Sequence, residues 1–372
     1  MTPRRLMMTT DTVGGVWVYA TGLAQGLARR GVRVTLVTLG PRPSGWKRAE
    51  ANALPSGVEL IPTDLALEWR DPEGCDIATA RCELLRIAAE VAPDIVHLNG
   101  FREGAFAWPC PALVVAHSCV WSWWKEVHKE WPPEPRWVSY RDGVAAGLRA
   151  AHAWAAPTAA FRDSIQDLYQ PAATGWVTRN GIDRPLASQE DKEPVILASG
   201  RVWDGAKNLF RLAGVAGELP WPVEIIGPGA PDGTEQAAPN VRWYGECDRV
   251  QLRARMSRAA VYAAPAQYEP FGLGILEAAA AGCALVLSDI PSLRELWDGA
   301  ALFVPPNDTE QMCAALVQIC TSDALRARLQ RAAAARARRY TMDRMVCGYL
   351  DLYETMLSRL DERMASAQEA FA

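Results

Sequence analysis

VYAAPAQYEPFGLGILEAAAAGCALVLS, residues 261–288, reads as a strand, a loop, a helix and a second strand. Segments 261–264 and 284–288 are short apolar runs bounded by turn residues, as in strands buried on both faces. Residues 272–281 between them are predicted to form a helix. A helix between two buried strands is typical of a parallel sheet that helices cover on both faces. We therefore expect an α/β fold.

The same alternation of strands and helices continues through most of the chain. Predicted strands occupy residues 5–10, 32–39, 58–61, 95–98, 112–116, 195–199, 223–226, 241–244, 261–264, 284–288 and 301–304. Predicted helices occupy residues 16–30, 208–217, 248–258, 272–281, 292–296 and 310–321. This pattern predicts two doubly wound parallel sheets, with a ligand cleft at their carboxyl edges.

The alternation pauses at residues 180–194, where glycine, proline and a charged run accumulate. We place the domain boundary there, because linkers have this composition. The prediction is a first Rossmann-like domain over 1–185, a second over 186–345, and a closing segment over 346–372. The amphipathic pattern of 342–368 predicts a long terminal helix, which we expect to pack back on the first domain.

Composition excludes several classes of protein. The 372 residues suffice for two domains, and a net charge of −4 gives no general attraction to nucleic acid. Nine cysteines without a C-x-x-C pair indicate neither a disulfide framework nor a zinc site. The apolar run at the start is too short for a signal peptide, and no run could cross a bilayer. We expect a cytoplasmic protein, with a peripheral contact to the inner face of the membrane left open.

Residues 269–277, EPFGLGILE, combine a helix start with two carboxylates. The first free N–H groups of the predicted helix, on Phe271, Gly272 and Leu273, suit a diphosphate, because they add to the positive end of the helix dipole. Glu269 and Glu277 would flank that diphosphate and accept hydrogen bonds from sugar and ribose hydroxyls. Taken alone, either residue is more typical of an ordinary surface glutamate on a helix cap.

The segment 269–277 resembles the signature of glycosyltransferase family 4, retaining enzymes of the GT-B fold. Other segments resemble motifs of that family in the same order, so the resemblance covers nearly the whole chain. These segments are DTVGGV (11–16), DIVHLNG (94–100), ALVVAHS (112–118), NGID (180–183), SGR (199–201) with KN (207–208), and the closing helix from Tyr340 through Tyr353. The resemblance implies two Rossmann-like domains of the GT-B type, with a nucleotide sugar on the second and an acceptor on the first.

The resemblance also implies how the leaving diphosphate is held. Arg201 and Lys207, with Gly200 beside them, resemble the family's basic pair, and fixed cations can stabilise the charge that develops on the leaving group. There is no D-x-D motif for a metal, so we predict a metal-independent enzyme without a cofactor. The family commonly has one residue fewer between the two cations, so we expect the loop at 203–205 to bulge.

Residues of the first domain are assigned by the same resemblance. Gly14 and Gly15 would let the backbone approach the diphosphate closely, and His117 resembles the histidine that contacts the donor sugar or its phosphate. A dinucleotide-binding loop is excluded, because there is no G-x-G-x-x-G and no acidic residue at the end of the second strand. The matching histidine motif also contains His97 and Asn99, whose role could equally be structural.

Five tryptophans mark the segment 120–137. Their faces could stack on a sugar or a flat acceptor from a mobile loop, or they could form a local core or a subunit contact. The residues assigned to acceptor binding are Trp17, His97, Asn99, Trp121, Trp123 and Trp124.

The sequence thus predicts a retaining hexosyltransferase that uses a UDP- or GDP-sugar. The acceptor (a glycan, a lipid or a small molecule) and the oligomeric state are left open. An epimerase or phosphorylase on the same fold and a non-catalytic nucleotide-sugar-binding protein are the alternatives.

Overall fold

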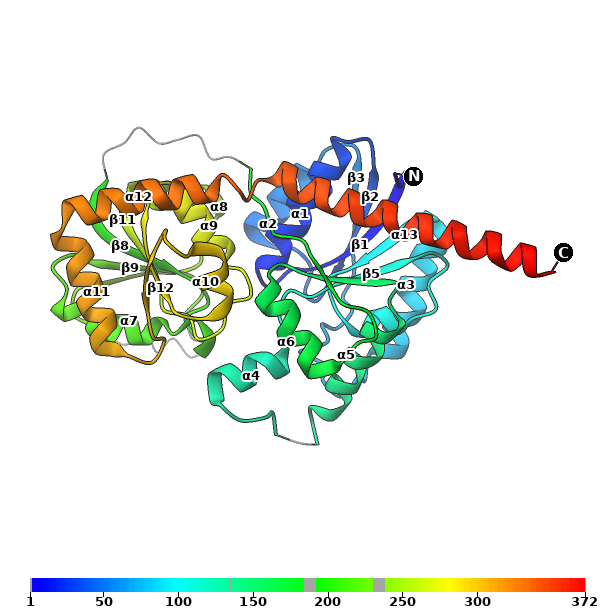
Figure 1. Cartoon of the computed structure of the whole chain (residues 1–372), viewed down its shortest axis with the longest axis horizontal. Helices are drawn as coiled ribbons and strands as arrows, with labels where there is room; N and C mark the ends of the chain where they lie inside the picture. Colours follow the sequence, from blue (N-terminus) through cyan, green and yellow to red (C-terminus); the bar gives the residue numbers. More distant parts are fainter. Residues whose placement is uncertain (1, 134, 184–191, 230–237, 372) are drawn as a thin grey trace. The chain divides into compact units, whose positions relative to one another are not determined.

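A computed structural model describes residues 2–133, 135–183, 192–229 and 238–371; for 363–371 it describes the backbone alone. The chain forms two compact units (Figure 1). The first comprises Met1–Ser122, Trp131–Gly181 and Met342–Ala372, and the second comprises Trp123–Glu130 and Ile182–Thr341. The boundary that we predicted between residues 185 and 186 lies outside the described residues.

The first unit contains a parallel sheet of seven strands in the order β3-β2-β1-β4-β5-β6-β7. Its strands are β1 (Arg5–Asp11), β2 (Arg33–Leu39), β3 (Val58–Pro62), β4 (Ile95–Leu98), β5 (Ala112–Val115), β6 (Ala153–Ala156) and β7 (Trp176–Val177). Its helices are α1 (Gly15–Ala28), α2 (Gly45–Asn52), α3 (Ile77–Val91), η1 (Arg102–Ala105), α5 (Val138–Ala150), α6 (Ala159–Tyr169) and α13 (Met342–Phe371). Helix α4 (Val120–His128) begins in this unit and continues into the second.

The second unit contains a parallel sheet of six strands in the order β10-β9-β8-β11-β12-β13. Its strands are β8 (Glu193–Ser199), β9 (Val223–Ile226), β10 (Val241–Tyr244), β11 (Ala259–Ala264), β12 (Ala284–Ser288) and β13 (Leu302–Val304). Its helices are η2 (Gly205–Lys207), α7 (Leu209–Val215), η3 (Ala216–Glu218), α8 (Arg249–Arg258), α9 (Leu273–Ala280), α10 (Pro291–Trp297), α11 (Thr309–Thr321) and α12 (Asp323–Ala337). The two parallel sheets expected from the alternation are confirmed.

Helix α13 packs against α1 within the first unit (Figure 1). Two glycines of α1 permit the close approach: a Cβ on Gly22 would lie 2.6 Å from Met342 Cε, and one on Gly26 would lie 2.5 Å from Val346 Cγ2. The helix begins at Met342, as the amphipathic pattern predicted, four residues before the boundary that we placed at 346. It brings Tyr349 and Tyr353 into the buried interior of this unit.

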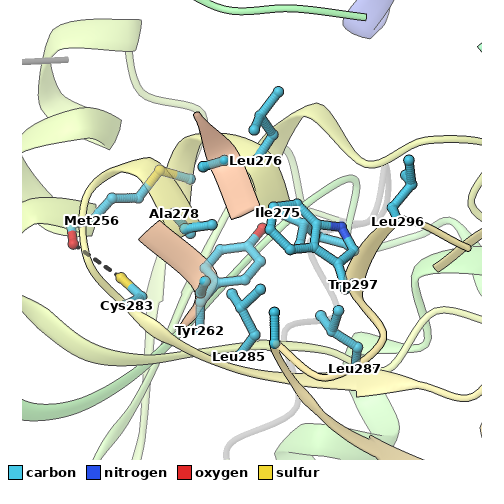
Figure 2. Close-up of a cluster of buried hydrophobic side chains, with 14 of the residues drawn as sticks. Met256, Tyr262, Ile275, Leu276, Ala278, Cys283, Leu285, Leu287, Leu296 and Trp297 are labelled. Atoms are coloured by element: carbon cyan, nitrogen blue, oxygen red, sulfur yellow. Dashed lines mark hydrogen bonds between the residues drawn. The ribbon is translucent and has the colours of Figure 1, made fainter. Parts of the chain in front are cut away.

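A buried core fixes helix α9 against its sheet in the second unit. Figure 2 shows Tyr262 of β11, Leu285 and Leu287 of β12 and Ile275 of α9 around the indole of Trp297. The Cys283 thiol in this cluster donates to the Met256 carbonyl oxygen (3.1 Å). Because the helix is held along its buried face, its first turn has a fixed position at the carboxyl ends of the strands.

Candidate functional site

Three neighbouring strands of the second unit end close to one another, and two of them end at residues predicted to bind the donor. Gly200 follows β8, Gly227 follows the adjacent β9, and the 265–272 loop follows β11 on the other side. Gly227 has a φ of +147°, and a Cβ at this position would lie 1.9 Å from the Gly200 carbonyl oxygen. Glycine is therefore required where these two loops meet.

Lys207 and Glu269 form an ion pair at this edge of the sheet. Lys207 Nζ lies 2.5 Å from Glu269 Oε2, and the two side chains keep 24% and 16% of their surface exposed. The lysine stem lies over Gly200, where an added Cβ would be 3.1 Å from Lys207 Cγ. The backbone N–H of Gln267 donates to the Ala206 carbonyl oxygen (2.8 Å), which fixes the two loops together. A cation and a carboxylate predicted from distant motifs are thus adjacent.

Arg201 forms the second ion pair, with Asp204. Arg201 Nη2 lies 2.5 Å from Asp204 Oδ2, and the other carboxylate oxygen accepts from Ala206 N (3.0 Å) and Trp123 Nε1 (3.1 Å). Burial raises the pKa of Asp204, but the charges of Arg201 and Lys207 outweigh it, so the pKa lies below its usual value. The carboxylate stays charged and holds its loop, which caps the short helix η2. Asp204 was not among the predicted site residues, although it lies in the loop that we expected to bulge.

Helix α9 begins without a side-chain cap. Its N-cap residue, Gly272, has left-handed backbone angles (φ +84°, ψ +67°), and Leu273 starts the helix. Phe271 is buried, and its ring meets the Tyr340 ring at 6.0 Å between centroids. The aromatic side chain therefore anchors the loop, while the first N–H groups of the helix suit an anionic ligand.

Glu277 is held by two arginines of helix α8. Its side chain keeps 11% of its surface exposed, and Oε1 accepts from Arg249 Nη2 (3.5 Å) and Arg253 Nη2 (3.4 Å) of α8. A carboxylate held between two guanidinium groups is oriented. These two arginines had no local signal in the sequence.

The glycine loop of the first unit is closed by an aspartate. Asp11 Oδ1 accepts from the backbone N–H groups of Val13 (3.1 Å) and Gly14 (3.0 Å), and helix α1 begins at Gly15. Trp17 on this helix is fully buried, and its Nε1 donates to Glu50 Oε2 (2.9 Å). A buried indole has no face for an acceptor, so we withdraw Trp17 from the acceptor site.

His97, Asn99 and His117 meet at the carboxyl ends of β4 and β5. Asn99 Oδ1 lies 2.8 Å from His117 Nε2 and 3.2 Å from His97 Nε2. His97 is fully buried, whereas His117 is half-buried. Burial lowers the pKa of each histidine to about 3, with a further contribution at His97 from His117. Both imidazoles are therefore neutral at pH 7.

The tryptophan-rich segment is helical over Val120–His128, so it does not form there the loop that one of the two interpretations assumed. Trp121 is buried and its ring lies 5.4 Å from that of Trp131, whereas the Trp124 ring lies 4.7 Å from that of His128. Trp123 and Trp124 are half-buried, and Trp131 is exposed. Packing against other aromatic rings thus accounts for Trp121, whereas Trp123, Trp124 and Trp131 keep part of their ring surface exposed.

Neutral His97 gives a testable dependence of stability on pH. Below its ordinary pKa of 6.5 the unfolded chain takes up a proton at this residue, but the folded chain does so only near pH 3. The free energy of unfolding should therefore decrease as the pH is lowered. His97 should account for about 2 kcal/mol of that decrease between pH 7 and pH 5. Glu68 has the opposite effect on the pH dependence of stability, because burial and the charge of Glu103 raise its pKa to about 7.

Comparison with His97→Gln isolates the histidine from Glu68, because Glu68 is present in both proteins. Urea unfolding at the two pH values should show the stability difference between wild type and variant shrinking by about 2 kcal/mol at pH 5. A difference that stays constant would contradict a neutral, buried His97.

No helix among the described residues is long and apolar enough to cross a membrane. Nor do three or more of their His, Cys, Asp and Glu side chains gather into a group that could hold a metal ion. Metal independence remains a prediction.

Two models of known families together match most of this chain. Residues 13–184 match the model described as Glycosyltransferase Family 4, and residues 193–322 match the model described as Glycosyl transferases group 1. The phosphatidyl-myo-inositol mannosyltransferase of Mycolicibacterium smegmatis is 38% identical over 139 residues, which is 36% of either chain. The chain thus matches about a third of the length of this relative.

Two solved structures share the fold over nearly the whole chain. Sucrose-phosphate synthase from Thermosynechococcus elongatus gives a TM-score of 0.80 at 17% identity and covers 96% of this chain and all of that one. Anabaena HepE in complex with UDP-glucose gives a TM-score of 0.71 at 16% identity and covers 97% of this chain and 99% of that one. At these identities the likeness shows the fold alone, which is that of GT-B glycosyltransferases.

Proposed function

This chain belongs to glycosyltransferase family 4, and we propose that it is a retaining hexosyltransferase using a UDP- or GDP-sugar. The acceptor in this proposal is a hydroxyl of a glycan, a lipid or a small molecule. The donor would bind the second unit, and the acceptor would bind the first. The proposal extends the family assignment, which supports glycosyl transfer.

The observation that carries this proposal is the pair of cations at the strand ends of the second unit. Arg201 and Lys207 are each held by a carboxylate, Asp204 and Glu269, at 2.5 Å. Their positions are therefore set before a ligand arrives, which is the condition for electrostatic stabilisation of a developing charge. The uncapped start of α9 adds N–H donors to the same edge of the sheet.

In the proposed reaction the bond between the anomeric carbon and the diphosphate oxygen breaks. Its electron pair moves to that oxygen, where Arg201 and Lys207 stabilise the negative charge. The acceptor oxygen forms the new bond on the same face of the sugar, and its proton passes to the departing diphosphate. Glu269 is paired with Lys207, so we assign it to binding sugar hydroxyls rather than to nucleophilic attack. This gives retention without a covalent intermediate on the protein.

Glu277 is proposed to receive the ribose hydroxyls of the donor. Its Oε1 faces Arg249 and Arg253, so Oε2 is the oxygen proposed to accept from the ribose. The two arginines fix the rotation of the carboxylate, which lowers the entropy lost when the donor binds. HepE, of the same fold, is described in complex with UDP-glucose, which favours a uridine nucleotide as the first donor to test.

A thermal-shift screen of UDP- and GDP-sugars with EDTA present tests this proposal. A donor at a hundred times its dissociation constant should stabilise the protein by about 2.7 kcal/mol. We expect one nucleotide series to raise the unfolding temperature, and Glu277→Gln to weaken that series. Glu246→Gln is the matched control, because Glu246 has no carboxylate role in the proposal. No shift with any nucleotide sugar, or a shift that requires a divalent metal, would contradict it.

A further inference from the structure

A chain of buried polar side chains in the first unit runs from the C-terminal helix to His117. Tyr353 Oη of α13 lies 2.6 Å from His97 Nδ1, and His97 Nε2 lies 3.2 Å from Asn99 Oδ1. The same Asn99 oxygen lies 2.8 Å from His117 Nε2. Tyr353 and His97 are fully buried, so neither exchanges these partners for water.

The orientation of the Asn99 amide is fixed by its other contacts. Asn99 Nδ2 donates to the Thr9 carbonyl oxygen (2.7 Å), and the Asn99 backbone N–H donates to Thr9 Oγ1 (3.0 Å). A flipped amide would place two oxygens against each other, because a backbone carbonyl can only accept. Asn99 Oδ1 therefore faces both histidines as an acceptor.

An acceptor facing two ring nitrogens determines where the protons lie. His97 and His117 must both carry hydrogen on Nε2 to donate to Asn99 Oδ1. Tyr19 Oη, 3.3 Å from His97 Nε2, is then a second acceptor for the hydrogen on that nitrogen. His97 Nδ1 is then a lone pair, which accepts from the Tyr353 hydroxyl. His117 Nδ1 is also a lone pair, and it has no hydrogen-bond partner among the residues that the structure describes.

We propose that Tyr353, His97 and Asn99 are positioning residues that hold the His117 proton on Nε2, so that Nδ1 accepts a hydrogen bond from a substrate hydroxyl. This inference rests on the proposed glycosyl transfer for its substrate. Non-bridging phosphate oxygens carry no proton and cannot donate to Nδ1. The geometry thus assigns His117 to a hydroxyl of the sugar or the acceptor rather than to the diphosphate.

The tautomers can be measured without turnover. The chain has four histidines, so two-bond ¹H–¹⁵N spectra of ¹⁵N-histidine-labelled protein can be assigned by single substitutions. We expect His97 and His117 to carry their proton on Nε2 from pH 6 to pH 9. Asn99→Ala should give His117 a mixture of tautomers, and Tyr353→Phe should do so for His97. Tyr349→Phe removes a neighbouring buried hydroxyl from the same helix and should leave both histidines unchanged.

Kinetics provide the second part of the test. Tyr353→Phe should lower kcat by roughly three- to tenfold, the effect of one hydrogen bond. Asparagine at position 117 can place an oxygen near the site of Nδ1, whereas glutamine reaches towards that of Nε2. His117→Asn should therefore retain about ten times more activity than His117→Gln.

The outcomes separate the two claims. Protonation of His117 on Nδ1 in the wild type, or higher activity for His117→Gln than for His117→Asn, would overturn the inference. If the tautomers are as expected but the protein transfers no sugar, the proposed function would be overturned instead.

Discussion

Lys207→Ala is expected to reduce glycosyl transfer by at least about a hundredfold while the fold survives. The ammonium group lies 2.5 Å from Glu269 Oε2 at the strand ends, where the proposed leaving group gains its charge. Loss of a positioned charge raises the transition state by a few kcal/mol. Fold survival is expected because both partners are partly exposed, so Glu269 can be hydrated in the variant.

Two further variants test whether the effect depends on the position of the cation or on its charge alone. Arg258→Ala removes another cation of the same unit, which pairs with Glu193 at 2.7 Å and is half exposed. It should transfer sugar at the wild-type rate. Lys207→Arg retains the charge but replaces a point charge by a planar group, and should recover part of the activity. Initial rates of nucleoside diphosphate release measure all three, and near wild-type turnover in Lys207→Ala would refute the role.

Gly227→Ala is expected to lower the free energy of unfolding by more than about 3 kcal/mol. The added Cβ would lie 1.9 Å from the Gly200 carbonyl oxygen, and its φ of +147° is a conformation that side chains rarely adopt. A backbone atom cannot move aside as a flexible side chain can, so the loop after β8 must shift. Because Arg201 follows Gly200, donor binding should weaken as well.

Gly214→Ala is the control for this variant. Gly214 lies in α7, is exposed, and has no atom within 4 Å of an added Cβ. Alanine there should stabilise the protein by roughly 0.5–1 kcal/mol, because it restricts the unfolded chain. Urea unfolding of both variants measures the two effects, and equal stabilities would contradict the close approach of Gly200 and Gly227.

The parallel sheets were predictable because buried strands have a strong local signal. Strands β4, β9, β10 and β12 have the predicted bounds. Strand β6, with the sequence AWAA, was missed because alanine has little strand preference. Helices α2, α3, α5 and α6 of the first unit were also not predicted. Their apolar positions are partly occupied by small or polar residues, which weakens the helical period.

The candidate site was predictable where function constrains residue type within a short motif. Arg201, Lys207 and Glu269 each stand in such a segment, and the fold brings them to one edge of a sheet. Their partners had no local signal. Asp204 is a single loop aspartate, and the arginines of Glu277 come from a separate helix. The contact of His97 with Tyr353 joins residues 256 positions apart, which no local pattern contains.

Calorimetric titration of the full chain with UDP and with GDP, in EDTA, measures whether Lys207 belongs to a metal-independent nucleotide site. We expect saturable binding of one nucleotide with one site per chain, and loss of most of that affinity in Lys207→Ala but not in Arg258→Ala. Binding that is absent for both nucleotides, or that is unchanged by Lys207→Ala, would contradict this expectation.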